Sequence, residues 1–273
     1  MNIYTWRSGL REAGTVAVAI LFLIPLFALV NMAIKPANSA TTAFQIDPNV
    51  TFANFATAWT QGALGPALVN SFIVAIVTVA GSVVLSALAS YPLARFTRRW
   101  SRWTYYLFIG GLLIPTQLGL LPLYTTMRDL GLLGSLASII LIGIGGQLPF
   151  SVFLYTTFMR EMPQDYEEAA LIDGCGPVRA FISVVFPLLK AVTGTVVILD
   201  AVGIWNDFFT PLLFLSGSGN ATAPVAIYNF HGQFHTQWPL IFAALCITVL
   251  PILVLYFLLQ KYIIRGFAGG LKG

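Results

Sequence analysis

The acidic residues of this chain are concentrated in one short segment, residues 160–190. The chain has ten Asp and Glu residues. Five of them lie in this segment: Glu161, Asp165, Glu167, Glu168 and Asp173. No metal-type spacing of cysteines accompanies them, because Cys175 and Cys246 lie far apart. The segment is therefore interpreted as a charged contact surface and not as a catalytic or metal centre.

Local signals predict two short helices joined by a glycine turn within this segment. Pro163 suits the first turn of a helix, and the acids follow where the helix dipole favours negative charge. Gly174 tolerates the left-handed conformation that ends many helices. Pro177 opens a second helix through residue 185, and Pro187 closes it. A protruding acidic segment of this kind is interpreted as a surface that docks in a groove of a protein partner. The alternative is an amphipathic helix at the membrane interface, although such helices usually carry basic residues on their polar face.

The elements that hold this segment are apolar and carry few charges. Hydrophobic residues make up 58% of the 273 residues and charged residues 9%, and the mean hydropathy is +0.84. Soluble domains carry about a quarter charged residues, so this chain is expected to be a membrane protein in contact with lipid. Its basic residues lie in loops without interleaved aromatic residues, so no nucleic-acid binding is expected.

Six charge-poor stretches are long enough to cross a bilayer as helices, for which about 20 residues suffice. They are residues 13–34, 67–93, 103–127, 136–159, 191–214 and 239–260. The predicted fold is therefore an all-α membrane protein with six transmembrane helices, and the acidic segment lies between the fourth and the fifth. The first stretch exceeds a typical signal-peptide core, so it is expected to remain as an anchor.

The basic residues predict the orientation of these spans, because cytoplasmic loops are enriched in Lys and Arg. With the N-terminus inside, only Lys35 and Arg128 of the 14 basic residues fall on the outer side. Both termini and the acidic segment are therefore expected to be cytoplasmic, in a multi-pass protein of the cytoplasmic membrane.

The acidic segment and several span ends resemble the permease subunits of ATP-binding-cassette (ABC) importers. Glu168-Ala169-Ala170, followed by Asp173-Gly174, Phe181 and Phe186-Pro187, is similar to the EAA loop of these permeases. Further matches to their carbohydrate-uptake branch, in particular to maltose-permease-G-like subunits, are Asn70-Ser71, Tyr91 to Arg95, Ile114-Pro115-Thr116, Leu148-Pro149-Phe150, Trp205 to Phe208 and Gln260 to Gly273. The resemblance covers nearly the whole chain. It departs at Ala191, where this branch often has a proline, and that change bears on how the fifth span begins.

This resemblance implies both the mechanism and the partners. The EAA loop of such permeases sits in a cleft of a cytoplasmic ATPase, whose closure turns the permease from inward- to outward-facing. The coupling residues that the resemblance implies are Glu167, Glu168, Ala169, Ala170, Asp173, Gly174 and Pro187. The implied assembly contains a second permease subunit, two ATPase subunits and an extracytoplasmic solute-binding protein, in a bacterial or archaeal cytoplasmic membrane.

The chain itself lacks the motif for nucleotide chemistry. No G-x-x-x-x-G-K-[ST] sequence, the loop that cradles nucleotide phosphates, occurs in it. It is therefore expected to be a transport subunit and no enzyme, with no cofactor of its own and with ATP and Mg²⁺ on the partner ATPase. The expected solute is a sugar or oligosaccharide. A permease for another solute stays open, and an ion-driven secondary transporter is less favoured because those usually have more spans and an internal repeat.

Two acids in the fifth predicted span indicate a translocation path, because a charge at the centre of a span costs about 2.5–3.5 kcal/mol. Asp200 and Asp207 are expected to share one helix face with Gly203. The candidates for lining or gating the path are Asp200, Trp205, Asn206, Asp207, Gln117 and Tyr124. Trp205 offers a ring on which a sugar could stack. The alternative is structural, with Asp207 bracing the end of the span and Trp205 lying at the membrane interface.

Overall fold

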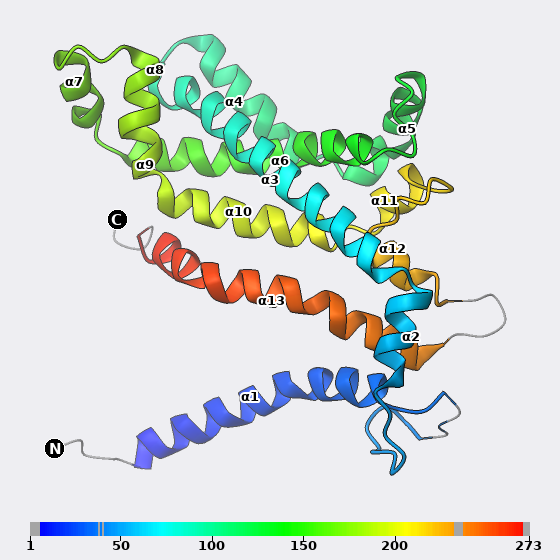
Figure 1. Ribbon diagram of the computed structural model, residues 1–273. Coiled ribbons are helices and arrows are strands. Elements are labelled where there is room, and N and C mark those ends of the chain that lie inside the picture. Colours follow the sequence, from blue (N-terminus) through cyan, green and yellow to red (C-terminus); the bar gives the residue numbers. More distant parts are fainter. Residues whose placement is uncertain (1–5, 38, 40, 232–236, 270–273) are drawn as a thin grey trace. The chain divides into compact units, whose positions relative to one another are not determined.

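Helices are the regular elements of the part of the chain that the computed structural model describes, residues 6–269 without 38, 40 and 232–236 (Figure 1). Four helices there are long and apolar enough to cross a membrane, judged by length and composition. They are α1 (Trp6–Ala33), α3 (Leu64–Arg95), α6 (Leu136–Glu161) and α13 (Trp238–Gly269). The bounds of α3 and α6 lie within three residues of the expected spans 67–93 and 136–159, whereas α1 and α13 extend further than expected.

The third expected span, residues 103–127, is not one straight helix. It consists of α4 (Arg99–Leu112), the 3-10 helix η1 (Thr116–Gly119) and α5 (Leu120–Asp129). The two arms meet at 97°. The break precedes Pro115, and proline both lacks an N–H group and disfavours helical backbone in the residue before it.

The fifth expected span, residues 191–214, is interrupted as well. The helical stretch Pro177–Leu188 meets α10 (Lys190–Trp205) at 75°. The short helix α11 (Phe209–Phe214) follows as a separate element. Six membrane crossings are therefore present only if each of the two bent pairs crosses as one span.

The chain divides into two compact units. The first comprises Met1–Gly65 and Ala226–Leu250, and the second comprises Pro66–Val225 and Pro251–Gly273. The short helix α12 (Ala223–Tyr228) lies at the point where the chain passes from one unit to the other.

In the first unit, buried polar side chains hold the loop that follows α1. Asn54, on α2 (Ala53–Gln61), donates hydrogen bonds to the carbonyls of Ala33 and Lys35 at 2.8 and 2.7 Å. The ammonium group of Lys35 is also buried, and it donates to the Thr41 hydroxyl at 2.8 Å. The bond to Ala33 satisfies a carbonyl that the end of α1 leaves without a helical partner, and the other two bonds hold the loop that follows.

The second unit carries the acidic segment at one end. Helix α6 packs against both α4 and α10. The apolar core of the unit comprises Val79, Val83, Ala87, Tyr155, Met159, Phe181, Val185, Leu189, Val192, Val196 and Ala201. Figure 1 shows α7 (Asp165–Ile172) and α8 (Pro177–Ala180) at one end of this unit, and α5 and α11 at the opposite end. The long helices therefore separate the acidic segment from the α5–α11 end.

Candidate functional site

The first half of the acidic segment has the predicted helix and glycine turn, but α7 begins at Asp165, so Pro163 precedes the helix and does not lie in its first turn. Helix α7 carries three acids in its first turn, where unpaired N–H groups favour negative charge. After the helix, Gly174 has a φ of 81°, in the left-handed region that glycine adopts without steric strain. The N–H of Cys175 donates to the carbonyl of Ala170 at 3.0 Å and closes the turn.

The second half of the segment is longer than predicted. Helix α8 passes into a π-helical stretch, η2 (Phe181–Val185), and then into α9 (Phe186–Leu188). Pro187 was expected to close this helix, but it lies inside the continuous helical stretch Pro177–Leu188, in α9. The break comes two residues later, at Leu189, and α10 begins immediately after it.

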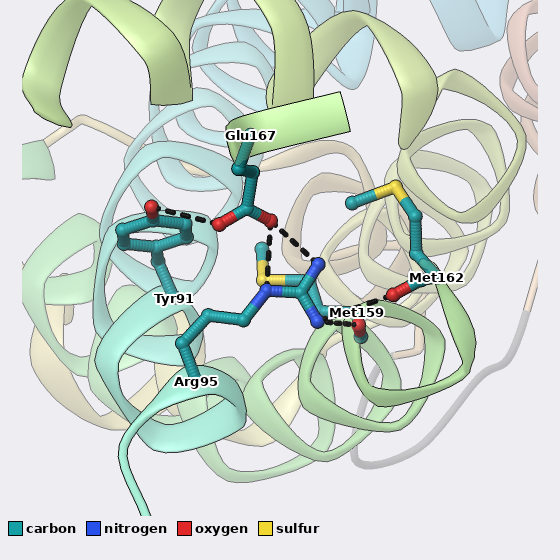
Figure 2. Close-up of polar contacts among 5 residues, drawn as sticks. All are labelled: Tyr91, Arg95, Met159, Met162 and Glu167. Atoms are coloured by element: carbon teal, nitrogen blue, oxygen red, sulfur yellow. Dashed lines mark hydrogen bonds and ion pairs between the residues drawn. The ribbon is translucent and has the colours of Figure 1, made fainter. Parts of the chain in front are cut away.

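Glu167 points inward from α7 and pairs with Arg95 at the end of α3 (Figure 2). Its Oε1 atom lies 2.6 Å from Nη2 and 2.7 Å from Nε of Arg95. Its Oε2 atom accepts a hydrogen bond from the Tyr91 hydroxyl at 3.0 Å. Nη1 of Arg95 also donates to the carbonyls of Met159 and Met162 at the end of α6. This cluster therefore ties α7 to the ends of both α3 and α6.

The ion pair is shielded from solvent, since the side chains of Arg95 and Glu167 are only 7% and 9% exposed. An unpaired charge in such surroundings is strongly destabilising, so the contacts that satisfy the pair also fix the position of α7. Glu167, expected among the coupling residues, is therefore engaged within the chain and is not displayed on its surface.

The other expected coupling residues form the outer surface of the segment. Glu168, Ala169, Asp173, Gly174 and Pro187 are exposed, whereas Ala170 is buried. Exposed apolar side chains flank them, among them Ile172 at 86% and Val178 at 70% exposure. Carboxylates surrounded by exposed apolar side chains are typical of a surface that another protein covers.

The segment is also anchored in the apolar core of the second unit. Phe181, Val185 and Leu189 are buried in the same cluster as Tyr155 and Met159 of α6. Protein interiors are close-packed and transmit strain. A displacement of the exposed tip would therefore be passed on to α6 and α10.

Asp200 is completely enclosed within the second unit. Its carboxylate accepts hydrogen bonds from the hydroxyls of Ser82 on α3, at 2.7 Å, and Ser151 on α6, at 3.2 Å. None of the three residues has exposed surface. Asp200 thus links three helices and has no exposed surface in this conformation, and its expected place on the solute path stays a prediction.

The expected face shared by Asp200, Gly203 and Asp207 is not formed. Helix α10 ends at Trp205, so Asp207 lies beyond it, and Gly203 is exposed whereas Asp200 is not. The Oδ1 atom of Asp207 accepts the N–H of Thr210, in the first turn of α11, at 3.2 Å. Asp207 thus lies between α10 and α11, and its role on the path or as a structural brace stays a prediction.

The remaining pathway candidates differ in exposure. Trp205 is buried and meets the ring of Phe72 edge to face, with centroids 5.0 Å apart. Asn206 is exposed at the end of α10, and Gln117 is exposed on η1. Tyr124 on α5 is 37% exposed. Of these four candidates, only Asn206, Gln117 and Tyr124 therefore present polar groups at the surface.

Several residues of the site were not singled out by the sequence. Arg95 was assigned only to the basic cytoplasmic loops and, with Tyr91, to a family motif; Ser82 and Ser151 had no role. One signal was available: α3 carries a hydroxyl at every fourth position, all four fully buried, namely Thr78, Ser82, Ser86 and Ser90. A hydroxyl stripe on an apolar helix indicates a face that packs against other helices.

Known proteins match this chain along almost all of its length. Residues 82–269 match the family described as "Binding-protein-dependent transport system inner membrane component". The chain is 34% identical over 254 residues to the melibiose/raffinose/stachyose import permease protein MelC of Bacillus subtilis (strain 168), which covers 93% of this chain and 92% of that protein. It is 32% identical over 258 residues to the trehalose transport system permease protein SugB of Mycobacterium tuberculosis (strain CDC 1551 / Oshkosh), with 92% and 93% covered.

A solved structure has the same fold. The crystal structure of a bacterial ABC transporter involved in the import of the acidic polysaccharide alginate contains a chain that superposes with a TM-score of 0.81. The match covers 96% of this chain and 99% of that chain at 19% identity. The chain therefore belongs to the family of binding-protein-dependent transport system inner membrane components, which are permease subunits of ABC importers and multi-pass proteins of the cytoplasmic membrane.

Proposed function

We propose that this chain forms half of the translocation path for a sugar or oligosaccharide that a solute-binding protein delivers. The proposal rests on relatives whose names state sugar import: melibiose, raffinose and stachyose for one, and trehalose for another. Both match this chain over more than nine-tenths of its length. These relatives differ in the sugar they carry, so the proposal is made for the class of solute.

In this proposal the partners are a second permease subunit, two ATPase subunits and an extracytoplasmic solute-binding protein. ATP and Mg²⁺ belong to the ATPase subunits. The termini and the acidic segment face the cytoplasm, and the α5–α11 end of the second unit faces the side from which the solute arrives. The basic residues of the chain support this orientation.

The outer surface of the acidic segment is the part that docks on the ATPase. The observation that carries this proposal is that the tip of the segment is acidic and exposed, whereas a buried ion pair attaches the same helix to α3. Glu168 and Asp173 are exposed at the tip, whereas Glu167 and Arg95 hold the same helix on α3. A tip that is both exposed and rigidly held can pass the motion of a partner to the membrane helices. Glu168 pairs with a basic group of the ATPase, and Gly174 allows close approach.

For the solute path, the exposed polar residues are the stronger candidates. Asn206, Gln117 and Tyr124 present groups that can exchange hydrogen bonds with a sugar hydroxyl. Trp205 is buried at the end of α10, and Asp207 is half-buried and accepts a hydrogen bond from the first turn of α11. Asp200 contributes to the path only in a conformation that opens the contact among α3, α6 and α10.

The test is ATP-driven uptake by the assembled transporter, purified through a tag on this chain and reconstituted with its solute-binding protein. We expect uptake of a sugar from a carbohydrate panel when ATP is enclosed with the ATPase subunits. Glu168→Gln should lower uptake and ATPase stimulation about tenfold or more, because hydrogen bonds to charged groups contribute about 1.5–3 kcal/mol. Glu161→Gln, an exposed acid outside the expected coupling set, is the matched control. Uptake driven by an ion gradient without ATP would refute the proposal.

A further inference from the structure

A basic hollow of about 290 Å³ lies at the turn between α3 and α4. The residues of its wall that carry the argument are Thr97, Arg98, Ser101, Arg102, Tyr105 and Arg160. None of the described residues that line it is acidic. The hollow therefore concentrates three positive charges in one concave site.

Two of these arginines, Arg98 and Arg102, are exposed and, in the part of the chain that the structure describes, unpaired, unlike their neighbour Arg95. The guanidinium of Arg95 is buried and paired with Glu167. Arg98 and Arg102 are exposed, and within the described residues neither has an ion-pair partner. Their guanidinium groups are therefore available to a ligand with negative charge.

The third arginine is held in place by the chain. Nη2 of Arg160 donates to the carbonyl of Leu93 at 3.2 Å, and its guanidinium carbon lies 4.4 Å from the ring centroid of Tyr105. A guanidinium stacked on a ring keeps the edge that is not hydrogen-bonded free for further donation. Arg160 thus gives the hollow one oriented donor beside the two exposed arginines, Arg98 and Arg102.

The start of α4 adds to the positive potential of the site. This helix of 14 residues begins at Arg99, and no side chain caps its first turn. The first N–H groups of a helix lack intrahelical acceptors and favour anions. The Ser101 hydroxyl is already engaged with the carbonyls of Pro92 and Leu93, so the charged donors of the three arginines are the main groups for a ligand.

Exposed aromatic side chains place the hollow at the depth of lipid headgroups. Trp100, Trp103 and Tyr106 are 48%, 71% and 54% exposed. Tryptophan and tyrosine are enriched at the two membrane–water interfaces, where one part of the ring is apolar and another is hydrated. The hollow adjoins the end of α3, a helix long and apolar enough to span the membrane.

We propose that this hollow binds a phosphate group, presented by an anionic phospholipid headgroup or as free inorganic phosphate. The planar guanidinium group can donate two parallel hydrogen bonds to two oxygens of a phosphate group. Basic pockets between membrane helices on the cytoplasmic side suit anionic headgroups. Arg160 is the one residue of this site that belongs to the acidic segment; the rest of the site lies outside it and outside the solute path, and its occupation does not depend on which solute is carried.

The experiment is a binding titration on the full-length protein in its assembled transporter, freed of endogenous lipid in detergent. The probes are short-chain phosphatidylglycerol, short-chain phosphatidylcholine and inorganic phosphate, and the readouts are tryptophan fluorescence and melting temperature. We expect phosphatidylglycerol to bind and to raise the melting temperature. The double variant Arg98→Gln, Arg102→Gln should weaken this binding about 30-fold, since each arginine near an anionic surface contributes about 1 kcal/mol.

Control variants separate a binding site from general surface charge. Arg128→Gln removes an exposed arginine outside the hollow and should leave binding within about twofold of wild type. Arg98→Lys with Arg102→Lys should recover part of the affinity, because the charge remains while the fork geometry is lost. Binding of phosphatidylglycerol alone identifies a lipid headgroup as the ligand, and competition by inorganic phosphate shows that the phosphate group suffices. Equal binding of phosphatidylcholine, or unchanged binding in the double variant, would overturn the proposal.

Discussion

Arg95 ties the acidic segment to α3, although no local sequence pattern connects the two. Its guanidinium meets Glu167 from 72 positions away in the sequence, and the same group holds two carbonyls at the end of α6. A buried pair of this kind contributes little net stability compared with an apolar replacement, but the loss of one partner is strongly destabilising. We therefore infer that the main role of the ion pair is to fix the position of α7.

A double-mutant cycle tests this view. Arg95→Met leaves the Glu167 carboxylate buried without its cation and should destabilise the protein by about 3–5 kcal/mol. The double variant Arg95→Met, Glu167→Met should recover at least half of that loss, as thermal unfolding would show. Recovery should be incomplete, because the Tyr91 hydroxyl also loses its acceptor. A double variant as unstable as the single one would contradict this.

The chain contains a matched control for that cycle. Arg128 and Asp129 form an ion pair at 2.9 Å, with side chains 60% and 67% exposed. Exposed pairs contribute about 0–1 kcal/mol, because water screens the charges. The corresponding methionine variants should therefore unfold within a degree or two of wild type, and a large effect there would show that the readout is not specific to burial.

Asp200 provides a second prediction at this scale. Asp200→Val would leave the hydroxyls of Ser82 and Ser151 buried without their acceptor, at about 1–3 kcal/mol for each unsatisfied group. Replacing both serines by alanine in the same variant should restore part of the melting temperature, because the three groups then become apolar together. Asp200→Asn, which keeps an acceptor oxygen, should be milder. A change in solute specificity with unchanged stability would instead place Asp200 on the path.

At the scale of the element, the turn after α7 depends on the backbone conformation of one glycine. Gly174 has a φ of 81° and no atom within 4 Å of the position that a Cβ would take, so substitution there meets backbone strain and no steric contact. Gly176 is equally open, but it has an ordinary φ of −68°. An alanine at Gly174 therefore tests the effect of backbone strain, and an alanine at Gly176 tests the effect of an added methyl group alone.

We expect Gly174→Ala to shift the turn at a cost of about 1–2 kcal/mol, and to reduce coupling of ATP hydrolysis to uptake. Gly176→Ala should change neither the conformation of the turn nor the coupling of ATP hydrolysis to uptake. The measurement is the number of ATP molecules hydrolysed for each solute imported by the reconstituted transporter. If the two alanine variants behave alike, the left-handed turn has no part in coupling.

At the scale of the whole molecule, the predicted orientation can be tested by labelling. In a Cys246→Ser background, Cys175 is the remaining cysteine of the chain, and it is partly exposed in the acidic segment. A membrane-impermeant maleimide should label it in inside-out vesicles and not in intact cells. Asp129→Cys, at the exposed end of α5, should show the opposite pattern. Labelling of Cys175 from outside would invert the topology and exclude contact with a cytoplasmic ATPase.

The sequence by itself determined the class of fold, the family and the position of the acidic segment. Hydropathy, charge bias and the local signals of α7 and Gly174 are properties of neighbouring residues, so they can be read along the chain. The bounds of α3 and α6 followed from the same properties, because these helices are uninterrupted apolar runs.

Only the tertiary structure decided which side chains meet. Glu167 and Glu168 are adjacent acids of the same type, yet one is buried on Arg95 and the other is exposed. Asp200 is enclosed because α3, lying 118 positions earlier, presents Ser82 to it. Burial is a property of neighbours in space, and helical periodicity specifies faces without specifying what each face contacts.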